Sequence, residues 1–287
     1  MSIHPETHVG RVELTVADIE RALGFYRDIL GFEVEREDGE ARLSADGREL
    51  VVLRESPGAE PQPEGTTGLY HYAILLPDRP SLGRVLKRLT SSGYPLWGAS
   101  DHLVSEALYL DDPDGNGIEI YRDRPRDEWR TTPDGSLQMA TLRLDLRSVL
   151  DAGAGEEWSG PPPGTTIGHM HLHVGDLGKA EEFYSGVLGL DVTVRYAGAA
   201  SFLSAGGYHH HLGVNVWAGQ DAPPPPEGSA GLRRFELVLP DAAELDRVRE
   251  RLDAAGVHYD REDGAINLKD PWGSGIALVV EGLEGGE

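Results

Sequence analysis

The chain of 287 residues contains no cysteine and only three lysines. Without cysteine it can form neither disulfide bonds nor thiolate metal sites, so a bound metal ion must be held by His, Asp or Glu. Asp and Glu outnumber Lys and Arg by 49 to 26, which gives a formal net charge of -23. This acidic excess makes nucleic acid and anionic membranes poor partners.

Long apolar runs are also absent. No segment approaches the roughly 18 consecutive apolar residues of a membrane span. The first residues, MSIHPETH, lack a basic flank followed by an apolar run, so no signal peptide is expected. We therefore expect a cytoplasmic protein, with no membrane partner, that folds as one large domain or two ordinary ones.

The sequence contains an internal repeat. Val9–Phe32 and Ile167–Leu190 align without a gap and share nine identities in 24 positions. Each copy begins with alternating apolar and polar residues, which is typical of a half-buried strand. An aspartate, Asp18 or Asp176, then stands at the N-cap position of a predicted helix, which we expect Gly31 to end in the first copy.

A second kind of unit is duplicated as well. The segments YHYAILLPD (70–78) and RRFELVLPD (233–241) are each followed by an amphipathic helix, a DP turn and a last strand. The fold class predicted is therefore α+β, with four βαβββ modules near 7–55, 68–123, 165–218 and 231–281. The first two modules form domain 1–130, a linker with a short helix covers 131–164, and the last two form domain 165–287.

These motifs resemble the vicinal oxygen chelate superfamily, which includes glyoxalase I, bleomycin-resistance proteins and extradiol dioxygenases. The resemblance rests on VGRVELTV…FYRDILGF and IGHMHLHV…FYSGVLGL. Four modules in one chain, with SEALYLDDPDGNGIEIY and GGYHHHLGVNVWAG, resemble a narrower group, the two-domain catechol 2,3-dioxygenases. The resemblance implies two open barrels of the glyoxalase/dioxygenase type, and a metal site shared by two modules.

The resemblance also implies where the ligands stand, in the first and last strands of the modules. The first strands offer Arg11, His71, His169 and Arg234, and the last strands of modules two and four offer Glu119 and Ala277. Modules two and three together therefore hold two imidazoles and one carboxylate. This ligand set forms the facial triad of Fe(II) oxygenases, and Mn(II) takes the same ligands.

Modules one and four offer arginine instead. Because arginine stays protonated, Arg11 and Arg234 cannot bind metal, and Glu13 and Glu236 can pair with them. The triad requires modules two and three to face each other, within a chain or across a homodimer or higher homo-oligomer. If modules one and two pair instead, His169 lies opposite Arg234 and His8 would have to replace it.

Other residues acquire roles from the same resemblance. His210, in the last strand of module three, is implied as the acid/base residue, with His209 or His211 as alternatives, and alternation places His210 on the opposite face from both. Tyr109 is implied to hydrogen-bond a substrate oxygen, and His102 matches less well because of its spacing.

His171 and His173 share the face of His169, so they are expected to orient ligands or line the pocket. Each of these residues also has a structural interpretation. Glu119 could be a solvated edge-strand charge, Tyr109 a barrel aromatic, and the histidine run a set of local hydrogen bonds.

The resemblance and the triad together favour an Fe(II)-dependent extradiol dioxygenase that cleaves a catechol with O2. A glyoxalase-like lyase or isomerase commonly needs a second carboxylate, which the apolar segment VNVW does not supply. A binding protein of the bleomycin-resistance type needs no metal ligands, so a complete triad counts against it.

Overall fold

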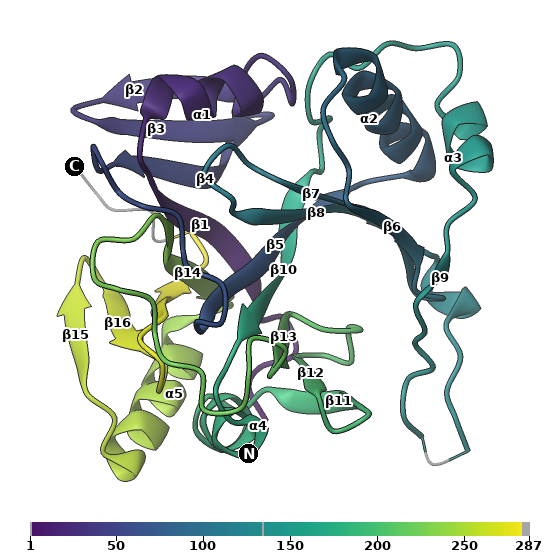
Figure 1. Ribbon diagram of the computed structural model, residues 1–287. Coiled ribbons are helices and arrows are strands. Elements are labelled where there is room, and N and C mark those ends of the chain that lie inside the picture. The colour runs from purple at the N-terminus through teal and green to yellow at the C-terminus, as the bar shows by residue number, and fades with distance from the viewer. Residues whose placement is uncertain (1, 134, 283–287) are drawn as a thin grey trace.

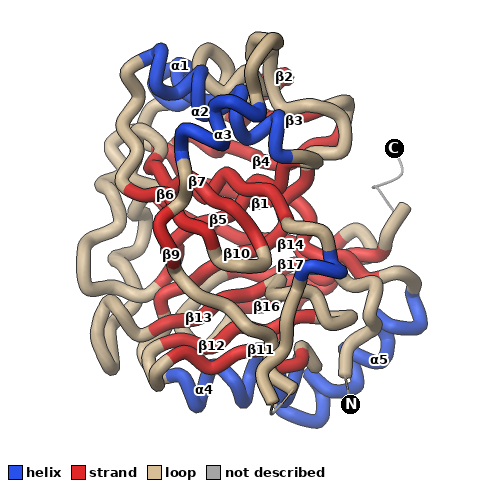
Figure 2. The backbone as a smooth tube through the Cα atoms, turned by 90° about the vertical axis from the view of Figure 1, so that its right-hand side faces the viewer, coloured by secondary structure: helices blue, strands red, loops and turns tan. Residues whose placement is uncertain are grey.

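The computed structural model describes residues 2–133 and 135–282. It contains four modules, each with one strand, one helix and three further strands in that order. Strands fill the middle of the molecule, with α1 and α2 at one end and α4 and α5 at the other (Figures 1 and 2). The predicted fold class, α+β with four βαβββ modules, is confirmed. No helix among the described residues has the length and apolar character needed to cross a membrane.

The first half of the chain contains modules one and two. Module one comprises β1 (His8–Val16), α1 (Ile19–Tyr26), β2 (Glu33–Glu37), β3 (Glu40–Ala45) and β4 (Arg48–Glu55). Module two comprises β5 (Gly68–Leu76), α2 (Arg79–Ser92), β6 (Gly98–Asp101), β7 (Ser105–Asp111) and β8 (Gly117–Asp123). The connecting segment that follows contains η1 (Arg126–Glu128), β9 (Leu142–Arg143) and α3 (Leu146–Ala152).

The second half contains modules three and four. Module three comprises β10 (Thr166–His173), α4 (Leu177–Glu181), the π-helix η2 (Glu182–Val187), β11 (Asp191–Tyr196), β12 (Ala200–Ser204) and β13 (Leu212–Asn215). Module four comprises β14 (Gly231–Leu239), α5 (Ala242–Ala255), β15 (Tyr259–Glu262), β16 (Ala265–Lys269) and β17 (Gly275–Val280).

The repeated helices begin as the sequence predicts. The side chains of Asp18 and Asp176 cap α1 and α4 by accepting hydrogen bonds from Arg21 N and Lys179 N. The expected end of the first helix is wrong, because α1 ends at Tyr26 and turns with helix-like hydrogen bonds continue to Gly31. A glycine at this point allows the positive φ of 78° that redirects the chain.

The four modules pair across the halves of the sequence. One sheet of nine strands has the order β11-β12-β13-β10-β5-β8-β7-β6-β9 and joins modules three and two through the antiparallel pair β5–β10. The other sheet, of eight strands, joins modules four and one through β1–β14. Each half of the sequence thus contributes one module to each sheet, and the domain boundaries given above stay a prediction.

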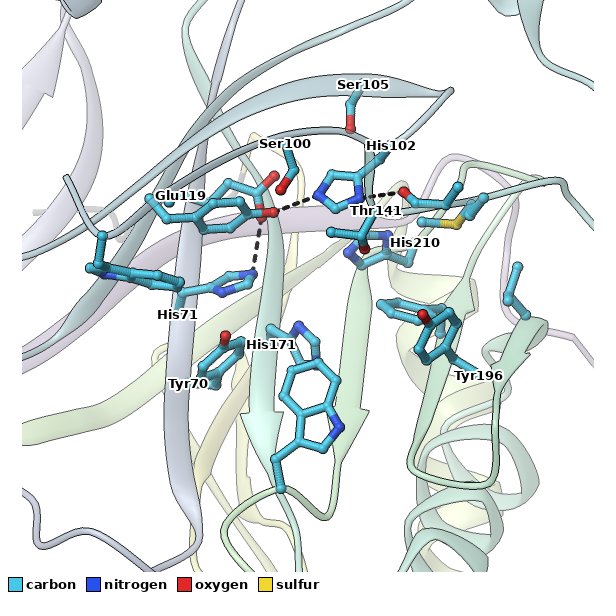
Figure 3. A pocket seen from close by; sticks show the side chains of 18 residues that line it. Tyr70, His71, Ser100, His102, Ser105, Glu119, Thr141, His171, Tyr196 and His210 are labelled. Carbon is cyan, nitrogen blue, oxygen red and sulfur yellow. Dashed lines mark hydrogen bonds and ion pairs between the residues drawn. The ribbon is translucent and has the colours of Figure 1, made fainter. Parts of the chain in front are cut away.

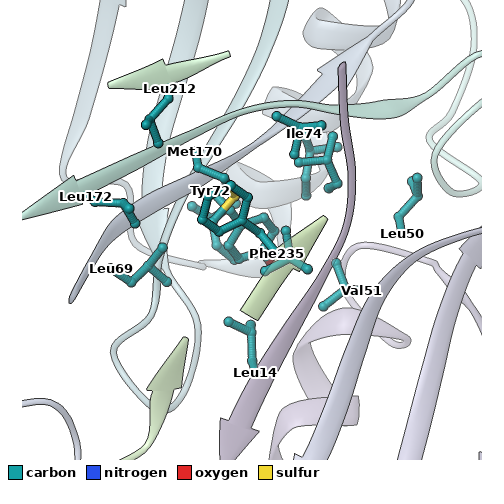
Figure 4. Close-up of a cluster of buried hydrophobic side chains, with 14 of the residues drawn as sticks. Leu14, Leu50, Val51, Leu69, Tyr72, Ile74, Met170, Leu172, Leu212 and Phe235 are labelled. Atoms are coloured by element: carbon teal, nitrogen blue, oxygen red, sulfur yellow. The ribbon is translucent and has the colours of Figure 1, made fainter. Parts of the chain in front are cut away.

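The main hydrophobic core contains side chains from both sheets. Leu14 on β1 and Phe235 on β14 are fully buried near Tyr72 on β5 and Met170 on β10 (Figure 4). Burial of apolar area of this kind stabilises the fold by about 25 cal/mol per Å². The core fixes the four central strands, from which the predicted ligand positions of the first strands project.

One hydrogen bond in each half of the chain connects the two modules of that half, and the two bonds are equivalent. The hydroxyl of Tyr26, in the first FY motif, donates to the buried carboxylate of Asp112 in the DPDGNG loop at 2.9 Å. The hydroxyl of Tyr184, in the second FY motif, donates to Asp270 in the DPWGSG loop at 2.8 Å. The two repeated motifs are therefore partners in the folded protein, and both pairs are buried.

Candidate active site

Three of the predicted ligands meet in the nine-stranded sheet. His71 on β5, Glu119 on β8 and His169 on β10 come from neighbouring strands, because β5 lies between β8 and β10. The Nε2 atoms of both histidines lie 3.1 Å from the same oxygen, Oε2 of Glu119. All three side chains are buried, so the interpretation of Glu119 as a solvated edge charge is wrong.

The unsatisfied nitrogens of this cluster fit a cation. Nδ1 of His71 and Nδ1 of His169 are buried and make no hydrogen bond with any described residue, and Nε2 of His71 meets Glu119 only in an ion-pair contact. Such groups are costly unless a ligand or ion engages them. One potential ligand atom from each of the three residues lies within 4.8 Å of the others, so one ion could reach all three. Two imidazoles and a carboxylate also suit Fe(II) or Mn(II) chemically.

The charge states of the cluster favour metal binding as well. Burial lowers the pKa of His169 to about 4, so its imidazole is neutral at neutral pH. Burial by itself would raise the pKa of Glu119, but His169 and His71 outweigh it and hold that pKa well below its ordinary value. A neutral imidazole and an ionised carboxylate are the forms that bind metal.

A cavity of about 280 Å³ opens beside the cluster (Figure 3). His71 and Glu119 line it, whereas His169 is not among its lining residues. Aromatic and apolar side chains form much of the remaining wall, namely Tyr70, Trp97, Tyr109, Val194, Tyr196, Phe202 and Trp217. A small flat molecule could therefore lie between aromatic rings with its polar edge toward the three ligands.

Tyr109 and His102 lie together in the wall of this cavity. The hydroxyl of Tyr109 lies 2.7 Å from Nε2 of His102, whose Nδ1 lies 2.8 Å from the backbone carbonyl of Ala140. A carbonyl only accepts, so His102 carries its proton on Nδ1 and its Nε2 accepts from Tyr109. The position of His102, which seemed insecure from its spacing, is thus next to Tyr109.

The run of three histidines departs from the prediction. His209, His210 and His211 lie in a bend before β13 and not in the strand, because Gly206 and Gly207 turn the chain with φ of 59° and 68°. Strand alternation therefore does not apply to them, and all three are buried. Of the three, His210 lines the cavity, so it is the one placed to meet a ligand.

The other two histidines of the run have partners within the protein. His209 contacts Asp123 and His210, and Nδ1 of His211 accepts a hydrogen bond from the backbone of Ala205 at 3.1 Å. Burial lowers the pKa of His211 to about 3, which keeps this ring neutral. His211 is thus hydrogen-bonded within the protein and is not among the residues that line the cavity, and its role stays a prediction.

His171 and His173 are both held by Asn215 on β13. The amide nitrogen of Asn215 lies 3.0 Å from Nε2 of His171, and its oxygen lies 2.7 Å from Nδ1 of His173. His171 lines the cavity and its ring centroid lies 4.9 Å from that of His71. His173 instead lines a neighbouring polar cavity.

Comparison with known proteins identifies the family. The model of the Glyoxalase/Bleomycin resistance protein/Dioxygenase superfamily matches residues 8–120 and 166–278. The chain belongs to this superfamily. The predicted family is therefore confirmed.

Several relatives of this superfamily member were found. A catechol-2,3-dioxygenase from Bacillus subtilis strain 168 is 48% identical over 284 residues, which are 97% of this chain and 99% of the relative. The crystal structure of a putative dioxygenase from Bacillus subtilis superposes with a TM-score of 0.68 at 13% sequence identity. The match covers 98% of this chain and 87% of the Bacillus subtilis chain. The crystal structure of glyoxalase I from Zea mays superposes with a TM-score of 0.59 at 17% sequence identity, and the match covers 96% of this chain and 92% of the glyoxalase chain. The two structural matches confirm the fold.

In this member of the superfamily, the equivalent positions of the eight-stranded sheet are occupied by ion pairs. Nε of Arg11 lies 2.6 Å from Oε1 of Glu236, and Nε of Arg234 lies 2.8 Å from Oε1 of Glu13. Two further arginines and two further glutamates extend this network, namely Arg42, Arg54, Glu40 and Glu49. The pairing predicted for Arg11 and Arg234 is confirmed, and four cations balance four carboxylates.

Several residues of the site were not identified from the sequence. Trp97 and Trp217 line the cavity at half exposure, and Asn215 holds two histidines, but nothing in the sequence assigned them to it. Asp123 could have been assigned to the site from the sequence, because side chains alternate along a strand and an even number of residues separates it from Glu119 on β8. The two side chains therefore lie on the same face of the strand. The contact of Asp123 with His209 confirms this orientation.

Proposed function

We propose that the protein is an Fe(II)-dependent extradiol dioxygenase that cleaves the ring of catechol or a substituted catechol with O2. The observation that carries the proposal is the buried cluster of His71, Glu119 and His169, in which Nδ1 of both histidines lacks a partner among the described residues, beside a cavity walled by aromatic rings. The chain is an enzyme of the extradiol dioxygenase class, in line with its 48% identity to a catechol-2,3-dioxygenase over nearly its whole length.

His71, Glu119 and His169 would hold the metal ion. Fe(II) held by these residues would supply a Lewis acid that lowers the pKa of the catechol hydroxyls and a redox centre for the reaction with O2. Mn(II) takes the same ligands and could support the same reaction. Both atoms of O2 enter the product, and the ring opens beside one of the two hydroxylated carbons.

The residues of the cavity would bind the substrate and manage its protons. His210 accepts a phenolic proton as the substrate binds and returns it as the ring opens, since a neutral imidazole can take up a proton and the imidazolium so formed can give it back. The hydroxyl of Tyr109 is directed by His102 and would donate to a substrate oxygen once that oxygen replaces Nε2 of His102 as its acceptor. Trp97, Phe202 and Trp217 would contact the faces and edges of the ring and exclude water from it.

The direct test is turnover of catechol by protein loaded with Fe(II) under anaerobic conditions and then mixed with oxygenated buffer. We expect a yellow ring-opened semialdehyde and the uptake of one O2 per catechol. Protein loaded with Mn(II) in parallel shows which metal supports the reaction. If iron-loaded protein consumes no O2 with any of several catechols, the proposal is wrong, and isomerisation of a hemithioacetal would then indicate the glyoxalase-like alternative.

A further inference from the structure

A chain of side chains leads from the cavity past His169, whose ring centroid lies 4.1 Å from that of His210 and 5.9 Å from that of His209, and ends at Asp123. Nδ1 of His210 lies 2.8 Å from Nδ1 of His209, and Nε2 of His209 lies 2.9 Å from Oδ1 of Asp123. His209 is 1% exposed and His210 6% exposed, so water cannot easily replace either partner. The carboxylate of Asp123 is thus connected to the ring of His210 through one intervening imidazole.

The direction of these hydrogen bonds follows from the chemistry of the groups. A carboxylate only accepts, so Nε2 of His209 must donate to Asp123. When His209 carries a single proton, that proton therefore lies on Nε2 and leaves Nδ1 of the same ring as an acceptor. Nδ1 of His210 must then be the donor in the contact between the two rings, because two unprotonated nitrogens would repel each other at 2.8 Å.

The consequence is a single protonation pattern for His210. With its proton on Nδ1, the ring keeps an unprotonated Nε2, and His210 is one of the residues that line the cavity. We propose that Asp123 and His209 are positioning residues that fix this tautomer, so that Nε2 of His210 is ready to accept a proton from the substrate. This proposal rests on the proposed function only in giving His210 that task.

The same arrangement would support His210 after the proton has moved. When Nε2 accepts the phenolic proton, His210 becomes an imidazolium whose Nδ1 still donates to His209. The negative charge of Asp123 is one imidazole away and favours that cation. A carboxylate that orients a histidine and stabilises its protonated form is a known arrangement in serine proteases, where it acts directly and not through a second ring.

Asp123 is itself held from a second side. The hydroxyl of Tyr208 donates to Oδ2 of Asp123 at 2.9 Å and lies 2.7 Å from the hydroxyl of Tyr121. The carboxylate therefore has one oxygen for His209 and the other for Tyr208. A Tyr208→Phe variant removes the contacts of this hydroxyl with Asp123 and Tyr121 but keeps the contact between Asp123 and His209, so it provides a matched control.

Nitrogen-15 spectra of the histidine rings in the full, metal-free chain test the tautomer directly. In the parent protein at neutral pH, we expect His210 to show a protonated Nδ1 and an unprotonated Nε2, with the signal assigned by its loss in His210→Gln. Tyr208→Phe should keep this pattern. Asp123→Leu, or His209→Phe if the first variant does not fold, should give a mixture of tautomers. A protonated Nε2 in the parent, or an unchanged pattern in these variants, would overturn the proposal.

Kinetics provide a second readout. For Fe(II)-loaded Asp123→Leu we expect kcat for catechol to fall by about 10–100-fold, with KM changed less than about threefold, since positioning residues typically act at this level. An unchanged kcat would overturn the proposal. The spectra need no turnover, so the absence of activity in the parent would contradict the proposed function without deciding the tautomer.

Discussion

At the scale of single residues, burial has opposite effects on the members of the triad. It lowers the pKa of His169 to about 4 and would by itself raise that of Glu119, but the two neighbouring histidines keep Glu119 ionised. The result is a neutral imidazole at His169 beside a charged carboxylate at Glu119 at neutral pH. A site in this state binds a divalent cation without first having to lose protons.

Tyr109 provides a prediction at this scale. The variant Tyr109→Phe removes the hydroxyl that contacts His102 and keeps the ring that lines the cavity. We expect kcat/KM for catechol to fall roughly tenfold or more, the value of a hydrogen bond to a charged oxygen, with metal content unchanged. Steady-state kinetics and iron analysis measure both quantities. Full activity in this variant would exclude the role given to the hydroxyl.

At the scale of elements, β8 connects the site to the rest of the sheet. Glu119 and Asp123 project from one face of the strand, while Arg122 projects from the other toward Glu106 on β7. Glu106 also contacts Arg79 at the start of α2. These ion pairs fix β8 between β5 and β7, and so fix the position of Glu119.

The pKa of Glu106 leads to a prediction about stability. Burial raises this pKa, but Arg79 and Arg122 outweigh burial and hold it below its ordinary value. The stability that ionised Glu106 gives to the fold is therefore fully present above its unfolded pKa of about 4.3 and is lost as the pH falls through its folded pKa. We expect Glu106→Gln to lower the free energy of unfolding by roughly 2–4 kcal/mol at pH 7.

Urea denaturation of both proteins at several pH values checks this expectation. The difference between Glu106→Gln and the parent should begin to shrink below about pH 4, where Glu106 of the unfolded parent takes up a proton, and should vanish as the pH falls through the folded pKa. A difference that stays constant down to pH 3 would show that Glu106 stabilises the fold by packing alone.

The ion-pair network of the eight-stranded sheet provides another prediction. Arg234→Ala leaves the buried Glu13 with Arg54 as its remaining arginine partner, so we expect the free energy of unfolding to fall by roughly 1–3 kcal/mol. The exposed neighbour Arg233 is a matched control, and Arg233→Ala should change stability by less than about 0.5 kcal/mol. Iron content should be unchanged in both variants. Loss of iron in Arg234→Ala would mean that this sheet takes part in the metal site.

The family resemblance implied which strands carry the candidate ligands, and the repeated strand and helix pattern of the modules located those positions in this chain. His71 and His169 stand at equivalent positions of aligned first strands, and Glu119 at the matching position of a last strand. The pairing of modules two and three depended on packing between distant strands, so it was visible only in the folded chain. The bend at His209–His211 was missed because period-two alternation assumes a strand, and the glycine pair before it ends that regularity.

At the scale of the whole molecule, charge and cavity agree on the kind of substrate. The chain carries a net charge of -23, and no described residue that lines the cavity is Arg or Lys. A carboxylate on the substrate would therefore enter an acidic protein and find no cation in the cavity wall. We therefore expect the protein to prefer catechols with no charged substituent.

Substrate competition tests this selectivity. We expect kcat/KM for 3,4-dihydroxybenzoate to be roughly 100-fold or more below that for catechol, because an unpaired buried charge costs several kcal/mol. 4-Methylcatechol, which carries an uncharged substituent at the same position, should react at a rate close to that of catechol. Equal turnover of the carboxylated and methylated substrates would contradict this account of the cavity.

The central claim is that His71, Glu119 and His169 hold the only metal ion that the reaction needs. The most direct measurement is the iron content and catechol turnover of His169→Ala after anaerobic loading, beside the parent and the exposed-site control His258→Ala. We predict one Fe(II) per chain and yellow product from the parent and the control, with neither from His169→Ala. If His169→Ala retains iron and activity, the metal site lies elsewhere and the account is wrong.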